Sequence, residues 1–92
     1  MTVKIRFFAR FRELLGNDIL MDVDAGTMFA PLITTIAQKN PEGYAAIFDE
    51  NGAFREFVIL MKNGKRIDIA DAVQTPVEDG DEIAVFPPVA GG

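Results

Sequence analysis

The sequence ends in two glycines, Gly91 and Gly92. Two residues separate them from Pro87 and Pro88, whose backbone is conformationally restricted. Glycine makes up about 7% of residues in proteins, so a given pair of positions holds two glycines by chance roughly once in two hundred times. Glycine also loses the most conformational freedom on folding and adds no side chain to a core. The ending predicts a functional tail, and the alternative is a disordered terminus with chance glycines.

The side chains that most often carry catalysis are missing. The sequence has no Cys, His, Ser or Trp, which excludes thiolate and serine nucleophiles, imidazole bases, and zinc or iron–sulfur sites built on these residues. Fourteen carboxylates remain. A carboxylate-pair enzyme stays open, but a solvated acidic surface explains these acids more simply. We expect the chain itself to bind no cofactor and no metal.

Length and charge narrow the class of protein further. Ninety-two residues, 49% of them apolar, suit one small domain with its own core. Nine basic residues against fourteen acidic ones give a net charge of -5, the wrong sign for neutralising phosphates, so nucleic acid is not an expected partner. The apolar stretches are too short or too interrupted by charges for a signal peptide or a membrane span. We expect a cytoplasmic protein that does not enter membranes.

The first half of the chain predicts a hairpin followed by a helix. Residues 2–8 alternate apolar and polar side chains, as a half-buried strand does, and residues 18–24 predict its hairpin partner. Residues 10–16 between them predict a short helix. After Thr27, a candidate N-cap, apolar residues at helical spacing predict the main helix, with Pro31 in or near its first turn. Asn40-Pro41 ends that helix and opens a second short helical turn over 41–48.

The second half predicts strands joined by turns. Residues 49–52 and 79–81 have turn composition, and Asn63-Gly64 fits a two-residue type I′ hairpin turn. Residues 68–77 are predicted as a loop. The predicted strands cover residues 54–62, 65–67 and 81–86.

This order predicts an α+β fold with one mixed sheet and one main helix on its face. If the last strand pairs parallel to the first, the arrangement is the β-grasp, or ubiquitin-like, fold. We predict one domain over residues 1–86 and an extended tail over 87–92, because the two prolines cannot continue the strand ladder.

Two stretches carry a resemblance to a known family. The motifs 7-FFARFRELLG-16 and 79-DGDEIAVFPPVAGG-92 resemble the MoaD/ThiS sulfur carriers, and within that family the small subunits of molybdopterin synthase. The longer segment over residues 48–67 is similar to archaeal-type members, some of which resemble ubiquitin-like protein modifiers.

The resemblance implies a chemistry for the terminus. In the family, an E1-like activating enzyme uses ATP and Mg²⁺ to adenylate the C-terminal carboxylate, here that of Gly92. An external persulfide or sulfide then converts it to a thiocarboxylate that donates sulfur. The chain would be a non-catalytic subunit, whose partner, the large subunit of molybdopterin synthase, holds the site where the molybdopterin dithiolene forms.

The same resemblance gives the tail a physical role. The carboxylate must be threaded into another protein, and Gly91 and Gly92 present no Cβ to obstruct a narrow channel. The six residues from Pro87 to Gly92, Pro88 and Val89 among them, extend roughly 20 Å at about 3.3 Å each. We therefore expect Pro87, Pro88 and Val89 to contact the partner.

The alternation of the strands predicts a docking surface beside the tail. If Val3, Ile5 and Phe7 face the helix, Phe8 and Phe86 face away, and Leu60 or Val58 is a further candidate for this surface. The alternative is that residues 10–16 cover Phe8.

Arg12, within the family-like motif, is a candidate for the rim of the docking surface. A plain surface ion pair with the adjacent Glu13 is the alternative.

Two alternative functions remain open at this point. One is a ubiquitin-like modifier joined through Gly92 to lysines of target proteins. The other is the sulfur carrier of thiamin thiazole synthesis. All three functions begin with the same adenylation.

Overall fold

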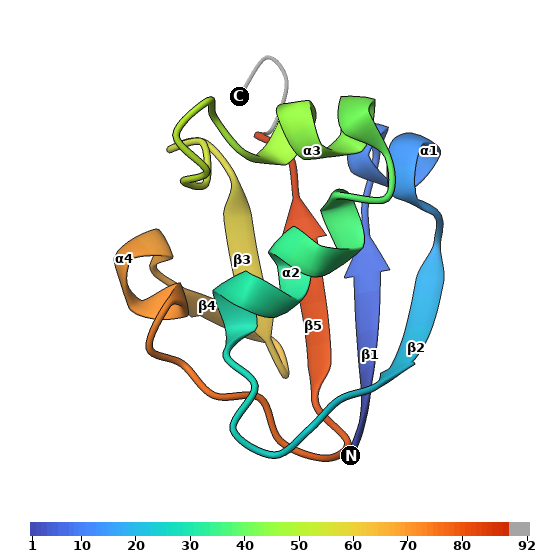
Figure 1. Ribbon diagram of the computed structural model, residues 1–92, viewed down its shortest axis with the longest axis vertical. Helices are drawn as coiled ribbons and strands as arrows, with labels where there is room; N and C mark the ends of the chain where they lie inside the picture. Colours follow the sequence, from blue (N-terminus) through green and yellow to red (C-terminus); the bar gives the residue numbers. More distant parts are fainter. Residues whose placement is uncertain (89–92) are drawn as a thin grey trace.

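The computed structural model describes residues 1–88, which form a five-stranded mixed sheet in the order β2-β1-β5-β3-β4. The central strand, β5, runs parallel to its neighbour β1, and every other neighbouring pair is antiparallel (Figure 1). The strands are β1 (Thr2–Phe7), β2 (Asp18–Asp22), β3 (Ile59–Lys62), β4 (Lys65–Ile67) and β5 (Glu82–Phe86). The parallel pairing of first and last strand confirms the predicted β-grasp arrangement.

The helices are α1 (Arg10–Leu15), α2 (Phe29–Ala37), α3 (Pro41–Ile47) and α4 (Ile69–Ala72). Of these, α2 crosses one face of the sheet (Figure 1). Its large buried side chains are 0 to 3% exposed, and they are Phe29, Leu32, Ile33 and Ile36. No helix among residues 1–88 is long and apolar enough to cross a membrane.

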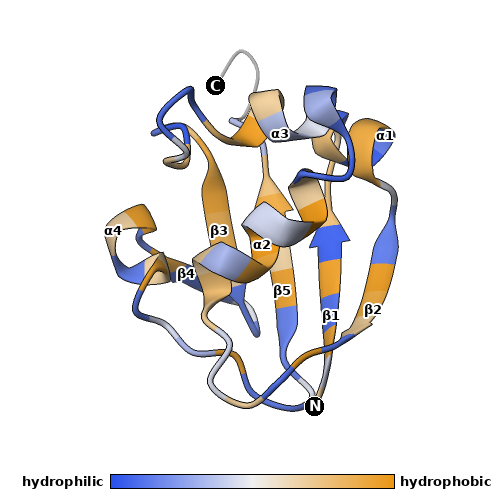
Figure 2. Cartoon of the chain, in the orientation of Figure 1, coloured by the Kyte–Doolittle hydropathy of each residue, from blue (hydrophilic) through white to orange (hydrophobic). Residues whose placement is uncertain are grey.

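The alternation of β1 and β5 builds the core. Figure 2 shows hydrophilic and hydrophobic bands alternating along β1, whereas β5 is hydrophilic only at its start. The side chains on the α2 side are at most 1% exposed, and they are Val3, Ile5, Phe7, Ile83 and Val85. Burying one such side chain contributes about 1.5–3 kcal/mol, so this face supplies much of the stability.

The main helix begins one residue later than predicted, and Thr27 is not its N-cap. Met28 occupies that position without a side-chain capping bond. The Thr27 hydroxyl instead donates to the carbonyl oxygen of Asp24 at 2.7 Å. A second connection takes its place: the Phe29 N–H donates to the carbonyl of Thr75, which ties the helix start to the segment before β5. Pro31 lies in the first turn, as predicted.

The predicted strand over residues 54–62 is only partly correct, because β3 begins at Ile59. The preceding residues are held elsewhere. The Arg55 N–H donates to Ile47 at the end of α3, and the Val58 N–H donates back to Arg55 across a turn. Phe54 pairs in an isolated bridge with Phe48, where their ring centroids lie 4.6 Å apart. Phe54 and Val58 are buried but Phe57 is 46% exposed, so this apolar segment packs on the core only in part and does not form an extended strand.

The predicted loop over residues 68–77 contains a short helix, α4. Four residues are too few to show a helical period, and the only member buried on the core is Ala72. By contrast, the hairpin turn is as predicted. Asn63 and Gly64 have φ angles of 52° and 82°, the two positive values that a type I′ turn requires.

Candidate docking face at the root of the tail

Phe8 and Phe86 stand side by side on the face of the sheet that points away from α2. Their rings are stacked, with centroids 4.1 Å apart and planes 10° from parallel. The parallel register places them there, because Phe7 lies opposite Val85 and the Phe8 N–H donates to the Val85 carbonyl at 3.2 Å. Both rings are half-buried. The predicted outward direction of these two residues is confirmed.

The stacked pair extends across neighbouring strands. Ile59 lies opposite Phe86, and Met61 lies opposite Ala84, so all of them share the outward face. Each is half-buried. We call this set, Phe8, Phe86, Ile59, Met61 and Ala84, the outer patch.

Leu60 and Val58 do not belong to the outer patch, contrary to the prediction. Leu60 is 0% exposed and Val58 is 2% exposed. Leu60 lies opposite Val85 and therefore points into the core. The sequence interpretation named these two residues without a register for this strand, and the pairing of β3 with β5 shows that Leu60 belongs to the inward set.

Arg6 is a residue of this face that the sequence interpretation missed. Its Nε lies 3.1 Å from Asp18 Oδ1 and its Nη1 lies 3.2 Å from Glu82 Oε1. The hydrogen bond that Arg6 donates to Glu82 and the charge of Asp18 raise the pKa of this guanidinium above its ordinary value. The Arg6 Cζ lies 5.5 Å from the Phe8 ring centroid, within reach of a cation–π interaction. The alternation of side chains along β1 places Arg6 on the outward face, and this alternation was the sequence signal that could have identified it.

Arg12 lies exposed on α1 and forms no ion pair with residues 1–88. The predicted alternative, a pair with Glu13, is wrong for this residue: Glu13 pairs with Arg10, at 3.5 Å. Arg10 also approaches Glu42 of α3, at 3.9 Å. Arg12 therefore keeps its charge available at the same end of the sheet as Phe8.

The junction between β1 and α1 holds Phe8 in place through an unusual backbone. Ala9 has φ 52° and ψ -126°, a region that favours glycine and is strained for a residue with a Cβ. The Phe11 N–H donates to the Phe8 carbonyl at 3.1 Å and closes the turn. Phe11, 2% exposed, is the residue through which α1 joins the core, so this turn points two aromatic rings to opposite sides.

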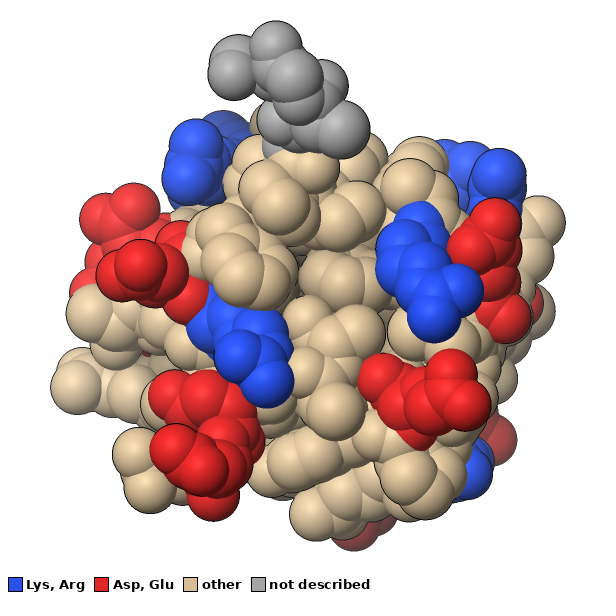
Figure 3. All heavy atoms as spheres, turned by 90° about the horizontal axis from the view of Figure 1, so that it is seen from above, with Lys and Arg blue, Asp and Glu red and all other residues tan. Residues whose placement is uncertain are grey.

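The strand that carries Phe86 ends there, directly before Pro87. Pro87 is half-buried and Pro88 is exposed. Figure 3, seen from above this end of the molecule, shows uncharged side chains over its centre with Lys, Arg, Asp and Glu groups around them. The predicted tail residues Val89, Gly91 and Gly92 lie outside the described residues.

A sequence model of the ThiS family matches residues 5–92. Small archaeal modifier protein 3 of Haloferax volcanii is 36% identical over 93 residues, which cover 100% of both chains. The molybdopterin synthase sulfur carrier subunit of Aedes aegypti is 34% identical over 96 residues, which cover 98% of this chain and 88% of that protein.

Among solved structures, the crystal structure of SAMP1 from Haloferax volcanii superposes with a TM-score of 0.86 at 25% identity and covers 100% of both chains. The match in sequence spans the chain from β1 onward, and the match in structure includes the whole sheet with its helices. The chain therefore belongs to the MoaD/ThiS family of sulfur carriers and small ubiquitin-like modifier proteins.

Proposed function

We propose that the protein is the sulfur carrier subunit of a molybdopterin synthase, with the carboxylate of Gly92 as its reactive group. The observation that carries the proposal is the position of the outer patch. The stacked Phe8 and Phe86 rings lie where β5 ends and the tail begins. A partner that binds this patch holds the root of the tail at a fixed place, so its active site can receive the terminus.

In this proposal an E1-like enzyme binds ATP and Mg²⁺, and the Gly92 carboxylate attacks the α-phosphate and releases pyrophosphate. Sulfide then attacks the acyl carbon, and AMP leaves to give the thiocarboxylate. A persulfide donor displaces AMP in the same way but forms an acyl disulfide, whose S–S bond a thiol must then cleave to release the thiocarboxylate. Apart from the Gly92 carboxylate itself, this chain contributes no nucleophile, base or metal ligand to either step. It contributes the docking face, and partner groups supply the charge that stabilises phosphoryl displacement.

The thiocarboxylate next meets the large subunit of the synthase, where it gives its sulfur to the pterin precursor. Both partners must hold the same root of the same tail, so we expect both to use the outer patch. Half-buried aromatic rings suit this role, because aromatic side chains are enriched where interfaces bury their centres. The similarity to a curated molybdopterin synthase sulfur carrier subunit supports this choice of pathway.

The direct test uses the purified chain, its activating enzyme, ATP and a sulfide donor, with intact mass as the readout. We expect a product in which sulfur replaces one oxygen, and a terminal acyl adenylate when the donor is omitted. Deleting Gly92 should abolish both products and leave the thermal midpoint nearly unchanged, because glycine adds no side chain to a core. A wild-type chain that gives neither product would refute the proposal.

A second function, conjugation to lysines of target proteins, is favoured by the 36% identity to a small archaeal modifier protein. The chain with an N-terminal affinity tag, expressed in its native host and recovered under denaturing conditions, separates the two. A carrier gives one species, since its partners dissociate. A modifier gives higher-mass adducts with Gly-Gly remnants on target lysines. Binding to a thiazole synthase instead of the large subunit would indicate the thiamin pathway.

A further inference from the structure

The two edge strands of the sheet carry opposite charges. β2 has Asp18 and Asp22 and no basic residue, whereas β4 has Lys65 and Arg66 and no acidic one. The acids of β2 are engaged within the chain, with Arg6 and with the Thr2 hydroxyl. Lys65 and Arg66 are exposed and form no ion pair with residues 1–88. The chain is acidic overall, yet one edge of its sheet is basic and unneutralised.

The backbone of β4 has one residue whose polar groups point outward. The two-residue Asn63-Gly64 turn makes Lys62 and Lys65 the hydrogen-bonded pair that closes the hairpin. Arg66, opposite Met61, is then a non-hydrogen-bonded position. The Asn63 N–H donates to Glu82 of β5, so by alternation Met61 also bonds β5 and not β4. The N–H and C=O of Arg66 therefore face the free edge.

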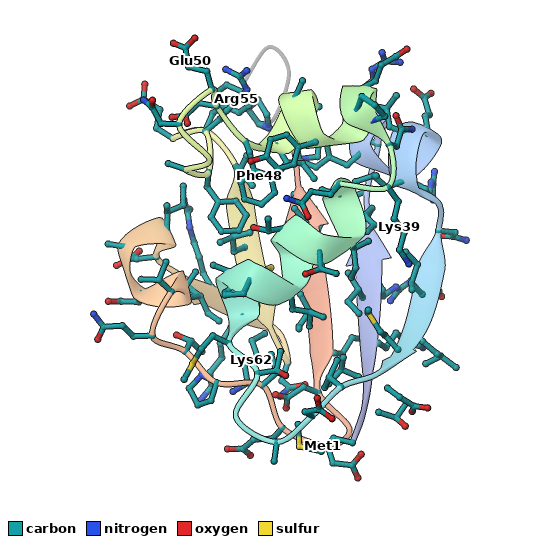
Figure 4. All side chains as sticks on the ribbon, in the orientation of Figure 1. Met1, Lys39, Phe48, Glu50, Arg55 and Lys62 are labelled. Carbon is teal, nitrogen blue, oxygen red and sulfur yellow. The ribbon has the colours of Figure 1, made fainter. Side chains whose placement is uncertain are left out.

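Arg66 also belongs to the face that carries the outer patch. Since it lies opposite Met61, its side chain leaves the sheet on the same side as Met61 and Ala84. A cavity of about 430 Å³ lies beside the hairpin, lined by Lys62, Asn63, Lys65, Arg66, Ile67 and Thr75. Lys62 is partly neutralised by Asp81, 3.5 Å away, and Figure 4 shows it at the opposite end of the sheet from Arg55 and Glu50. The basic edge thus adjoins the outer patch along β3.

We propose that β4 receives an acidic extended segment of the synthase large subunit, which adds a short strand to the sheet while the outer patch docks. One residue of that segment would bond the N–H and C=O of Arg66, and its carboxylates would meet Lys65 and Arg66. This inference rests on the proposed function. It commits to a partner with an acidic strand because both the free backbone pair and the free positive charges lie at this one edge.

The test measures the affinity of the full chain for the purified large subunit as salt is varied. We expect Arg66→Glu to weaken binding about tenfold at low salt and less at high salt, since exposed charges are screened beyond about 8 Å at physiological ionic strength. The matched control is Lys39→Glu, an exposed lysine following α2. It makes the same change in net charge away from the edge, and it should bind like the wild type.

A second pair of variants tests the strand pairing itself. Arg66→Gln removes the charge, and Arg66→Pro removes the charge and the outward N–H without taking a hydrogen bond from β3, because proline is tolerated where an edge N–H faces solvent. We expect Arg66→Pro to bind at least about threefold more weakly than Arg66→Gln, at an unchanged thermal midpoint. Equal affinities would refute strand addition.

Failure of the strand-addition inference and failure of the proposed function would give different experimental results. All Arg66 variants should form the terminal thiocarboxylate, as judged by intact mass, because the tail chemistry does not involve β4. If wild-type chain forms the thiocarboxylate and binds the large subunit, but Arg66→Glu and Arg66→Pro bind equally well, then the cations of β4 only protect an exposed edge from pairing. If the large subunit does not bind wild-type chain, both the partner and this inference are wrong.

Discussion

The two faces of the central sheet are built from alternate residues of the same strands, yet they differ in enclosure. Phe7 and Val85 point toward α2 and are at most 1% exposed, whereas Phe8 and Phe86, one position later, are half-buried and stacked on each other. The inner face is closed by the chain's own helix. The outer patch keeps apolar area available to another molecule. One hydrogen-bonded ladder thus supports stability on one side and recognition on the other.

If this comparison is right, truncating the inner face damages the fold and truncating the outer face damages binding. The largest effect should come from Phe7→Ala. Removing a fully buried aromatic ring leaves a cavity beside Ile5 and Val85, and we expect a loss of about 3–5 kcal/mol in the free energy of unfolding. Urea denaturation with an unchanged slope measures it. A loss as small as that of an exposed residue would contradict the assignment of Phe7 to the core.

The matching change on the outer face is Phe86→Ala. We expect it to weaken binding to the synthase large subunit by about 1–3 kcal/mol, since the ring would be an anchor buried in the interface. The unfolding free energy should fall by less, because Phe86 already contacts solvent. Leu20→Ala is the control: Leu20 is 71% exposed and lies outside the outer patch. Equal losses in binding and folding would place Phe86 with the core.

The sequence predicted both faces because alternation is a local property. Val3, Ile5 and Phe7 stand in a run with strict period two, and the register of β1 against β5 then follows from burying both apolar sets under one helix. The start of β3 was not predictable in this way. Phe54 and Val58 are apolar and buried, but their burial depends on α3 and on the Arg55 turn, which are tertiary contacts.

Arg6 and Ala9 show the same limit within the candidate site. The outward direction of Arg6 follows from parity, but its hold on Asp18 and Glu82 requires three strands to be in place. The positive φ of Ala9 has no sequence signal at all, because alanine gives no hint of a turn that favours glycine. The alternation of the sequence identified the outward face of the sheet. The contacts that position the residues of that face are visible only in the assembled sheet.

Asp81, a charged residue on the inner side of the sheet, provides a further test of the comparison between the two faces. Asp81 is 6% exposed at the entry to β5. Burial alone would raise the pKa of Asp81, but hydrogen bonds from the Asn63 amide and the Glu78 N–H, with the nearby Lys62 charge, outweigh it and lower the pKa below its ordinary value. The ionised carboxylate thus joins the β3–β4 hairpin to the start of β5.

Because the pKa of Asp81 is lower in the folded chain than in the unfolded one, its contribution is fully present above the ordinary carboxyl pKa of about 3.9 and is lost as pH falls through the folded value. We expect Asp81→Asn to cost roughly 1–2 kcal/mol at pH 7. The difference from wild type should shrink below about pH 4. Unfolding by urea at several pH values measures it, and a difference that is constant down to acid pH would contradict the role of the charge.

The smallest expected effect concerns Ala9, where the two faces meet. Its φ of 52° with ψ of -126° is strained for alanine, and glycine adopts this region without a Cβ clash. We expect Ala9→Gly to raise the unfolding free energy by about 1 kcal/mol, after the entropy that glycine loses on folding. Ala9→Val should lower it, because a β-branched side chain tolerates positive φ less well.

Affinity for the large subunit should stay within about twofold for Ala9→Gly, since the Phe11 to Phe8 hydrogen bond and the ring stack still hold Phe8 in the outer patch. Thermal and urea unfolding measure the stability, and titration with the large subunit measures the affinity. If Ala9→Gly gains stability but loses affinity well beyond twofold, then the strained turn, and not the stacking on Phe86, is what orients Phe8 for docking.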